Sequence, residues 1–159
     1  MTFLLIGQIW VNHHVMFDHV GRADRLVLFL NTLLLLDVAL MPFTTAVLAK
    51  AFRDGFGERT AVAVHGMTFE VAAILFNIIW LHIRRAELIG STIHPSGVRA
   101  ISRRFGLAVV WIATGTVLGA VIPLLGVAVI AAFIAYYWLP ITGEVQNKHR
   151  TQRRRSGSG

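Results

Sequence analysis

The sequence contains no cysteine and few charged residues, and these two absences narrow the class of protein it can encode. Without cysteine, disulfide bonds, zinc–thiolate sites and thiol catalysis are excluded. Charged residues make up 14% of the chain, whereas a soluble domain normally carries about 25%. Catalytic signatures such as G-x-S-x-G, H-E-x-x-H and Gly-rich phosphate loops are also missing. The sequence therefore predicts a protein that is neither a soluble domain nor an enzyme.

Apolar residues dominate what is present. They account for 55% of the 159 residues, and the mean hydropathy is +0.65. The formal net charge is +7, but the basic residues flank apolar runs and do not cover a folded face, so we expect no nucleic-acid partner. This composition predicts one integral membrane domain.

The apolar runs predict an all-α, polytopic membrane helix bundle. We expect four to five spans within a domain of residues 1–145, followed by a basic cytoplasmic tail at 146–159. At about 1.5 Å per residue, a helix over 26–49 covers roughly 36 Å, enough for a hydrocarbon core of about 30 Å. The uncharged stretch 105–141 would cover about 55 Å, so it is divided at Pro123 and Gly126. The predicted spans are 2–17, 26–49, 61–83, 105–122 and 125–141.

The distribution of Lys and Arg predicts the orientation of this bundle, because cytoplasmic loops are enriched in both residues. Lys50, Arg53 and Arg59 lie on one side. The other side carries Arg22, Arg25, Arg84, Arg85, Arg99, Arg103, Arg104, Lys148, Arg150, Arg153, Arg154 and Arg155. The C-terminus is therefore predicted to be cytoplasmic. The protein itself is predicted to lie in a bacterial plasma membrane. Segment 84–104 is expected to be the longest internal loop.

Residues near the predicted span ends are expected to contact the membrane surface. Arg153, Arg154 and Arg155 in the tail could hold anionic lipid headgroups, although a simple positive-inside anchor explains them equally well. The aromatic residues near span ends are typical of an interfacial belt. They are Trp10, Trp80, Tyr136, Tyr137 and Trp138.

Polar side chains inside the predicted spans are the first candidates for a site, because an unpaired polar group in hydrocarbon is costly. Asp37 lies at the centre of its span, and Glu70 lies near the centre of the next, on the same helix face as Asn77. The two carboxylates could meet as a cation- or proton-sensitive site. Alternatively, each is paired locally and fixes helix packing.

Three histidines near one end of the spans allow a second function class. His13, His14 and His82 could ligate haem, which would make the chain a membrane cytochrome. Adjacent histidines point about 100° apart on a helix, so only one of the first two could face a given haem. Hydrogen bonding between helices is the alternative role. No metal site and no other cofactor are predicted.

Several spaced motifs resemble the transmembrane protein 175 family, the lysosomal and prokaryotic potassium channels. They are W-V-N-H-H-x-x-F, a turn with D-R, L-x-L-N-x-L-x-L-L, M-P-F-T-T-A, R-R-A and R-R-F. The resemblance implies a six-helix subunit that forms a homotetramer around a potassium pathway without a T-V-G-Y-G filter. It predicts a potassium-permeable channel subunit, with potassium as the conducted ion. A haem-binding cytochrome and a non-conducting membrane assembly subunit remain the alternatives.

The chain departs from the family pattern at its start. The family's first helix carries R-x-x-x-F-S-D and the residues that constrict the pore, and that motif does not occur here. We therefore expect a further helix upstream of Met1 and name no pore residue. The resemblance implies a helix-packing role, that of holding the family's first helix, for Trp10, Asn12, His13, His14 and Asn31. It assigns no role to the carboxylate in the middle of the second span.

Overall fold

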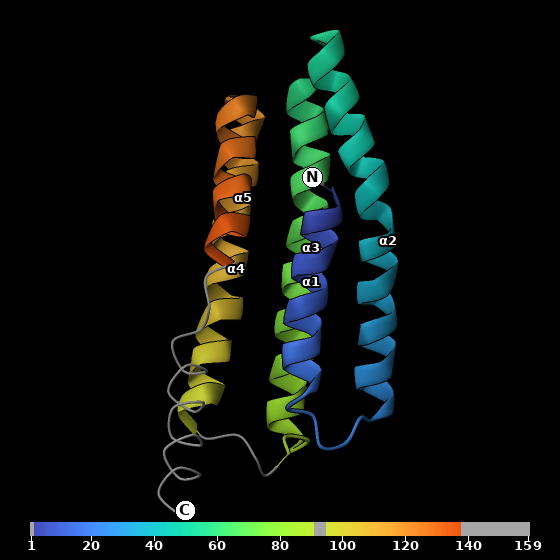
Figure 1. The fold of residues 1–159 in the computed structure, drawn as a ribbon, viewed down its shortest axis with the longest axis vertical. Helices are drawn as coiled ribbons and strands as arrows, with labels where there is room; N and C mark the ends of the chain where they lie inside the picture. The colour runs from blue at the N-terminus through green and yellow to red at the C-terminus, as the bar shows by residue number, and fades with distance from the viewer. Residues whose placement is uncertain (1, 91–94, 138–159) are drawn as a thin grey trace, which may run out of the picture.

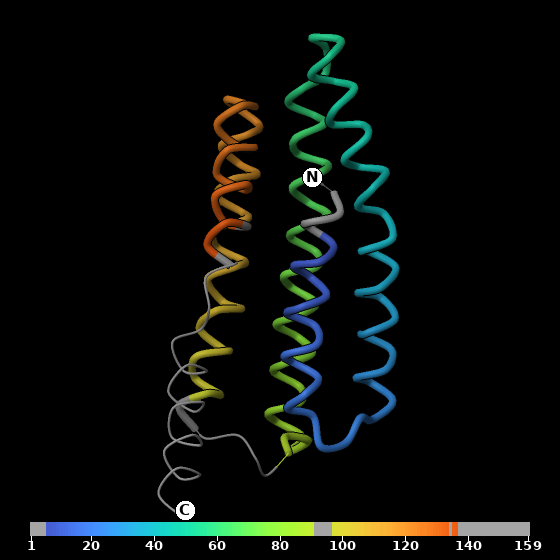
Figure 2. Tube along the Cα trace, viewed as in Figure 1, coloured from blue at the N-terminus to red at the C-terminus, as the bar shows by residue number. Residues whose placement is uncertain are grey.

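Five α-helices make up the fold in the computed structural model, which describes residues 2–90 and 95–137. They are α1 (Thr2–Phe17), α2 (Arg25–Asp54), α3 (Glu58–Arg85), α4 (Pro95–Val121) and α5 (Pro123–Tyr137). The helices run up and down beside one another, with α3 between α2 and the α4–α5 pair (Figure 1). The chain trace in Figure 2 shows that the coloured part of α1 lies along the lower part of the bundle, beside α3. The helical bundle predicted from the apolar runs is confirmed.

Three of these helices are long and apolar enough to cross a membrane: α2, α3 and the Gly97–Val121 part of α4. The apolar part of α5, Pro123–Phe133, is shorter. At 30 residues, α2 is about 45 Å long, so it extends beyond a hydrocarbon core of about 30 Å.

The α2–α3 hairpin is defined by its caps. Asp24 precedes α2 and accepts a hydrogen bond from the Val27 backbone N–H at 2.8 Å, which satisfies one of the free donors of the first turn. Gly55 ends α2 with φ of 66° and Gly57 precedes α3 with φ of 75°. A left-handed backbone is readily adopted by glycine, so the sequence G-F-G permits this tight turn.

Helix α3 is the centre of the core. Its buried residues lie on two stripes, one facing α2 and the other facing α4. The stripe of α2 that faces α3 repeats every three or four residues, as expected for a helix with one buried face. It consists of Val27, Leu30, Leu34, Asp37, Met41, Thr44, Leu48 and Ala51. One ionisable side chain therefore interrupts an otherwise mostly apolar interface.

Helix α4 begins about ten residues earlier than the predicted span. Residues 95–104 were expected to belong to a loop, yet they are helical from Pro95 onward. Proline is favoured at the first helical position, because its missing N–H is not needed there and its φ is already helical. The three arginines of this segment mark the boundary of the apolar zone and do not mark the end of the helix.

Trp80 is also placed differently from the prediction. It was expected at the membrane interface, but its side chain is 2% exposed and its indole N–H donates to Ser102 Oγ on α4 at 2.9 Å. The side chain lies on the inner face of α3, so its position near the end of a span was misleading. Trp10, by contrast, is exposed, as the interfacial reading requires.

Candidate functional site

Helix α2 presents a series of polar side chains to its neighbours. Asp24, Asn31, Asp37 and Thr44 follow one another at intervals of six or seven residues, which corresponds to about 10 Å along the helix. Three of these residues bind a histidine from another helix. This series is the main polar feature of the described bundle.

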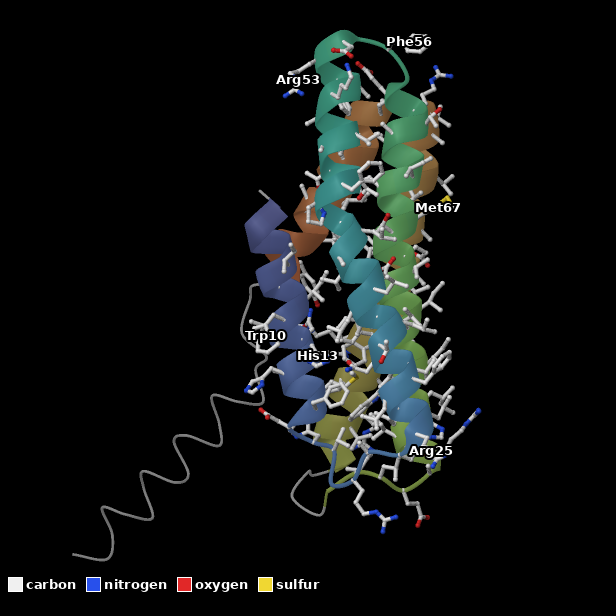
Figure 3. All side chains as sticks on the ribbon, turned by 90° about the vertical axis from the view of Figure 1, so that its right-hand side faces the viewer. Trp10, His13, Arg25, Arg53, Phe56 and Met67 are labelled. Carbon is white, nitrogen blue, oxygen red and sulfur yellow. The ribbon has the colours of Figure 1, made fainter. Side chains whose placement is uncertain are left out.

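Asn31 connects α2 to α1. Its Oδ1 lies 2.7 Å from His13 Nε2, and the imidazole stacks on Phe17 one turn further along α1, with ring centroids 4.4 Å apart. His13 and Phe17 are at positions i and i+4, so their side chains lie on one face of the helix. Figure 3 shows His13 on the side of α1 toward α2. Two members of the helix-packing set are therefore in direct contact.

The other members of the helix-packing set point elsewhere. Trp10 is 64% exposed on the outer side of α1 (Figure 3). His14 is also exposed and lies 3.7 Å from Asp18, one turn along the chain. Asn12 lines a cavity behind α1. For these three residues the described part of the chain shows no hydrogen bond to another helix. Their assigned packing role stays a prediction.

The cavity lies between α1, α3, α4 and α5 and has a volume of about 60 Å³. Two polar residues one turn apart on α1, Gln8 and Asn12, form its polar edge. The remaining lining residues are apolar: Ile9, Phe69, Ala72, Ala73, Phe76, Phe105, Ala108, Ile112, Ile130 and Phe133. The cavity adjoins α1, but Met16 of the same helix is fully buried in the core that α3 and α4 share.

Thr44 connects α2 to α3 through a contact that sequence reasoning missed. Its hydroxyl oxygen lies 3.0 Å from His65 Nδ1 and 3.1 Å from the Met41 carbonyl oxygen. Both side chains are buried, and Phe69 meets the imidazole edge-on. The available signal was a histidine and a threonine at matching depths in the two predicted spans that form one hairpin.

Asp37 is buried without a partner. Its side chain is 8% exposed, and its Oδ2 atom forms no hydrogen bond with the described residues. Glu70 has an equally buried and unpartnered Oε2 atom. A carboxylate without a partner is costly in apolar surroundings, so both groups are candidates for a functional role.

The two carboxylates do not meet across the α2–α3 interface. Asp37 lies on the α2 stripe that faces α3. Glu70 lies between Gly66 and Asn77 on a stripe of α3 that faces α4, because Gly66 abuts a threonine of α4 and Asn77 donates to an α4 carbonyl. No ion pair or hydrogen bond joins them within 2–90 and 95–137. The paired site expected from their similar depth is therefore not formed.

Asn77 has a structural role in this arrangement. Its amide nitrogen donates to the Phe105 carbonyl oxygen of α4 at 2.8 Å and to the Ala73 carbonyl oxygen of its own helix at 2.9 Å. Both donors of the amide are therefore used. The residue thereby cross-links α3 to α4.

Asp24 connects the start of α2 to the end of α3. Its Oδ2 lies 2.6 Å from His82 Nε2. The Val27 backbone N–H and, after it, the His82 imidazole lower the pKa of the Asp24 carboxyl below its usual value of 3.8. The same end of the bundle is closed by two backbone hydrogen bonds, from Gly21 N–H to the Leu88 carbonyl and from Gly90 N–H to the His19 carbonyl.

These contacts bear on the haem reading. The Nε2 atoms of His13 and His82 are engaged with Asn31 and Asp24, so either histidine would have to break a protein contact to bind iron through that nitrogen. Within the described part of the chain, no group of three or more His, Asp or Glu side chains is arranged to hold a metal ion. The tail residues Arg153, Arg154 and Arg155 lie outside the described residues.

The chain is similar in sequence to proteins that are named as potassium channels. The sequence model of the family described as endosomal/lysosomal potassium channel TMEM175 matches residues 1–42. A protein of Streptomyces collinus named as a potassium channel is 38% identical over 108 residues, which is 67% of this chain and 52% of that protein. A second protein with that designation, from Chamaesiphon minutus, is 35% identical over 105 residues, or 65% of this chain and 51% of that protein. The chain thus spans about half the length of these relatives.

The fold has a counterpart among solved structures. The crystal structure of a lysosomal potassium-selective channel TMEM175 homolog from Chamaesiphon minutus aligns with a TM-score of 0.73 and 30% sequence identity. The alignment covers 86% of this chain and 68% of that chain. The likeness therefore extends well beyond the first two helices that the family model matches.

Proposed function

Because this chain belongs to the transmembrane protein 175 (TMEM175) family, we propose that it is a subunit of a channel that conducts potassium passively across a membrane. The observation that carries the proposal is the structural match over 86% of the chain to a potassium-selective homologue. Three helices long and apolar enough to span a membrane agree with it. The named relatives are channels, and no enzymatic role is proposed.

The test of conduction is reconstitution of the natural polypeptide that contains this sequence into liposomes with an outward potassium gradient. We expect a potassium flux that collapses when the gradient is removed and that exceeds the flux of sodium under the same gradient. Liposomes that contain a correctly folded, correctly assembled protein and yet show no cation flux would contradict the proposal. A strong Soret band lost in a His82→Ala variant would favour the haem alternative instead.

We further propose that the C-terminus is cytoplasmic, in a bacterial plasma membrane. Arg25 and Arg53 lie at opposite ends of the bundle (Figure 3), and the described arginines are concentrated at the Arg25 end. That asymmetry supports a cytoplasmic location for this end. A cytoplasm-active reporter fused after Arg155 should be active, whereas activity of an exported reporter at that position would reverse the orientation.

Assembly as a homotetramer is the third part of the proposal. Large apolar side chains on the outer face of α2 are exposed in the isolated chain, among them Phe29, Leu36 and Phe43. Such a surface suits either lipid or another subunit. Chemical cross-linking in native membranes should yield species up to four subunits, and a ladder that stops at two would contradict this stoichiometry.

Asp37 is proposed as a cation- or proton-sensitive group of this channel. Its buried, unpartnered Oδ2 atom is the supporting observation, because proteins retain such costly groups mainly for function. An Asp37→Asn variant should change the pH dependence of potassium flux while leaving the fold intact. A Glu70→Asn variant tests the second carboxylate separately, since the two lie at different helix interfaces. Identical pH profiles in all three proteins would assign both residues to helix packing.

A further inference from the structure

The outer face of α4 changes in character along its length. Its exposed residues recur every three or four positions and begin with two arginines, Arg99 and Arg103. Beyond them the stripe is apolar apart from one threonine. It continues through Leu107, Val110, Trp111, Thr114, Val117 and Ala120. A basic head followed by an apolar stripe is the surface pattern that complements an anionic amphiphile.

No described side chain neutralises the charges of Arg99 and Arg103. Neither side chain forms a hydrogen bond or an ion pair with the described residues. Helices α4 and α5 contain no Asp or Glu at all. At positions i and i+4 the two arginines lie about 6 Å apart at their Cβ atoms, so their repulsion favours an anion between them.

Arg84, at the same end of the bundle, donates to Ser102 Oγ of α4 at 3.0 Å. The α4 pair has no such contact with the described residues, and it begins an exposed apolar stripe.

The depth of the pair in the membrane follows from the neighbouring helix. On the outer face of α3 the last exposed apolar residue is Leu81, and Arg85 follows one turn later. The Arg84–Ser102 bond fixes α4 beside this boundary, so Arg103 lies where α3 also turns from apolar to basic. That level corresponds to the headgroups of one leaflet.

The surface next to the pair has room for an acyl chain. A Cβ atom added to Gly106, between Arg103 and Leu107, would meet no other atom within 4 Å. Further along the stripe, Trp111 stacks on Tyr136 of α5 with ring centroids 5.8 Å apart. This aromatic pair extends the apolar surface beyond Val110.

We propose that Arg99 and Arg103 bind the phosphate of one anionic phospholipid whose acyl chain lies along Leu107 and Val110. Two guanidinium groups can each donate to phosphate oxygens, and the exposed apolar stripe offers the acyl chain an apolar surface to cover. The site rests on the proposed orientation of the bundle, which makes the lipid one of the cytoplasmic leaflet. It does not rest on conduction of potassium.

Native mass spectrometry of the purified protein tests the site by titration with dioleoyl phosphatidylglycerol and, separately, dioleoyl phosphatidylcholine. The Arg99→Gln/Arg103→Gln variant should bind phosphatidylglycerol about 30-fold more weakly than the unmodified protein, with little change for phosphatidylcholine. The matched control is Arg53→Gln/Arg59→Gln, which removes two exposed arginines from the opposite end. Arg99→Lys/Arg103→Lys keeps the charge and should retain most of the preference.

Equal loss of phosphatidylglycerol in the Arg99/Arg103 variant and its control would overturn the proposal. So would competition by inorganic phosphate or dihexanoyl phosphatidylglycerol as strong as that by the long-chain lipid, because the acyl chain would then contribute nothing. Both arginines are exposed, and circular dichroism verifies that each variant keeps its helical content. Lipid preference without potassium flux would support this site while contradicting the proposed channel.

Discussion

The α3–α4–α5 side of the bundle and the α1–α2 side are held together by different means. On the first side backbones approach so closely that a Cβ atom on Gly126 would overlap the Gly119 backbone, and side-chain hydrogen bonds cross between α3 and α4. On the second side, α1 meets α2 through His13 and Asn31 and faces a cavity. The difference shows that close backbone approach holds α4 against α5, whereas α1 combines the fully buried Met16 with a polar contact beside a cavity.

The largest effect is expected where backbones touch. Gly126→Ala places a methyl group against the Gly119 Cα and N atoms, and backbone cannot move aside as a flexible side chain can. We expect a loss of about 3 kcal/mol in the free energy of unfolding, measured by thermal unfolding in detergent with circular dichroism. Gly106→Ala is the control, because open space surrounds that position and alanine should stabilise the helix by up to about 1 kcal/mol. Equal effects would contradict the steric account.

A smaller loss is expected from the polar link between α3 and α4. Ser102→Ala removes the acceptor of both the Trp80 indole N–H and the Arg84 guanidinium. A buried indole donor without a partner should cost about 1 to 3 kcal/mol, measured by the same unfolding experiment. Thr114→Val is the control, since the exposed Thr114 hydroxyl donates only to its own helix. A Ser102→Ala protein as stable as the control would show that the link is dispensable.

On the α1–α2 side, Asn31→Leu removes the acceptor of His13. Hydrogen bonds between membrane helices contribute about 1 kcal/mol, so we expect weaker oligomer assembly, measured as the fraction of assembled protein in detergent. Thr45→Val serves for comparison, because its hydroxyl donates to Met41 in the same helix at 2.8 Å. Assembly unchanged in both variants would remove the assigned role of Asn31.

The smallest effect is expected at the Asp24–His82 contact and only in acid. The pKa of Asp24 is lowered in the folded protein, so the stability that its carboxylate contributes is complete above about pH 3.8 and is lost as the pH falls through the lower folded value. Asp24→Asn retains an N-cap but should flatten this acid-dependent part of the melting temperature as the pH is lowered from 5 to 2. Asp18→Asn, at an exposed position, is the control. Unchanged acid dependence in Asp24→Asn would refute the contribution.

Sequence reasoning located the helices because hydrophobic length is a local property. It misplaced the start of α4, since Arg99 and Arg103 were read as loop residues although a helix continues readily through arginines at the headgroup level. It also placed Trp80 at the interface, because proximity to a span end does not reveal which face of the helix a side chain occupies. The first error concerns how far a helix extends beyond the apolar zone, and the second concerns direction around a helix axis; a single sequence leaves both open.

The sequence predicted the candidate site only in part, because it does not specify direction around a helix axis. The carboxylates Asp37 and Glu70 were singled out as polar residues in apolar runs, and each has a buried oxygen without a partner among the described residues. The predicted pair of carboxylates is not formed. The sequence shows how far along its helix each residue lies, but it does not show in which direction around the helix axis the side chain points. The contact between Thr44 and His65 was missed, since neither residue is unusual on its own.

By itself, the sequence determined that this protein is a bundle of apolar helices with a basic end, because those properties depend on composition and on the length of each run. The family resemblance followed from spaced motifs between Trp10 and Phe105. Only the tertiary structure decided which polar groups meet: it paired Asn31 with His13 and Thr44 with His65, and it left Asp37 alone. Hydrogen bonds require atoms within about 3 Å, and that precision comes from the rotation and register of packed helices, which no single helix specifies.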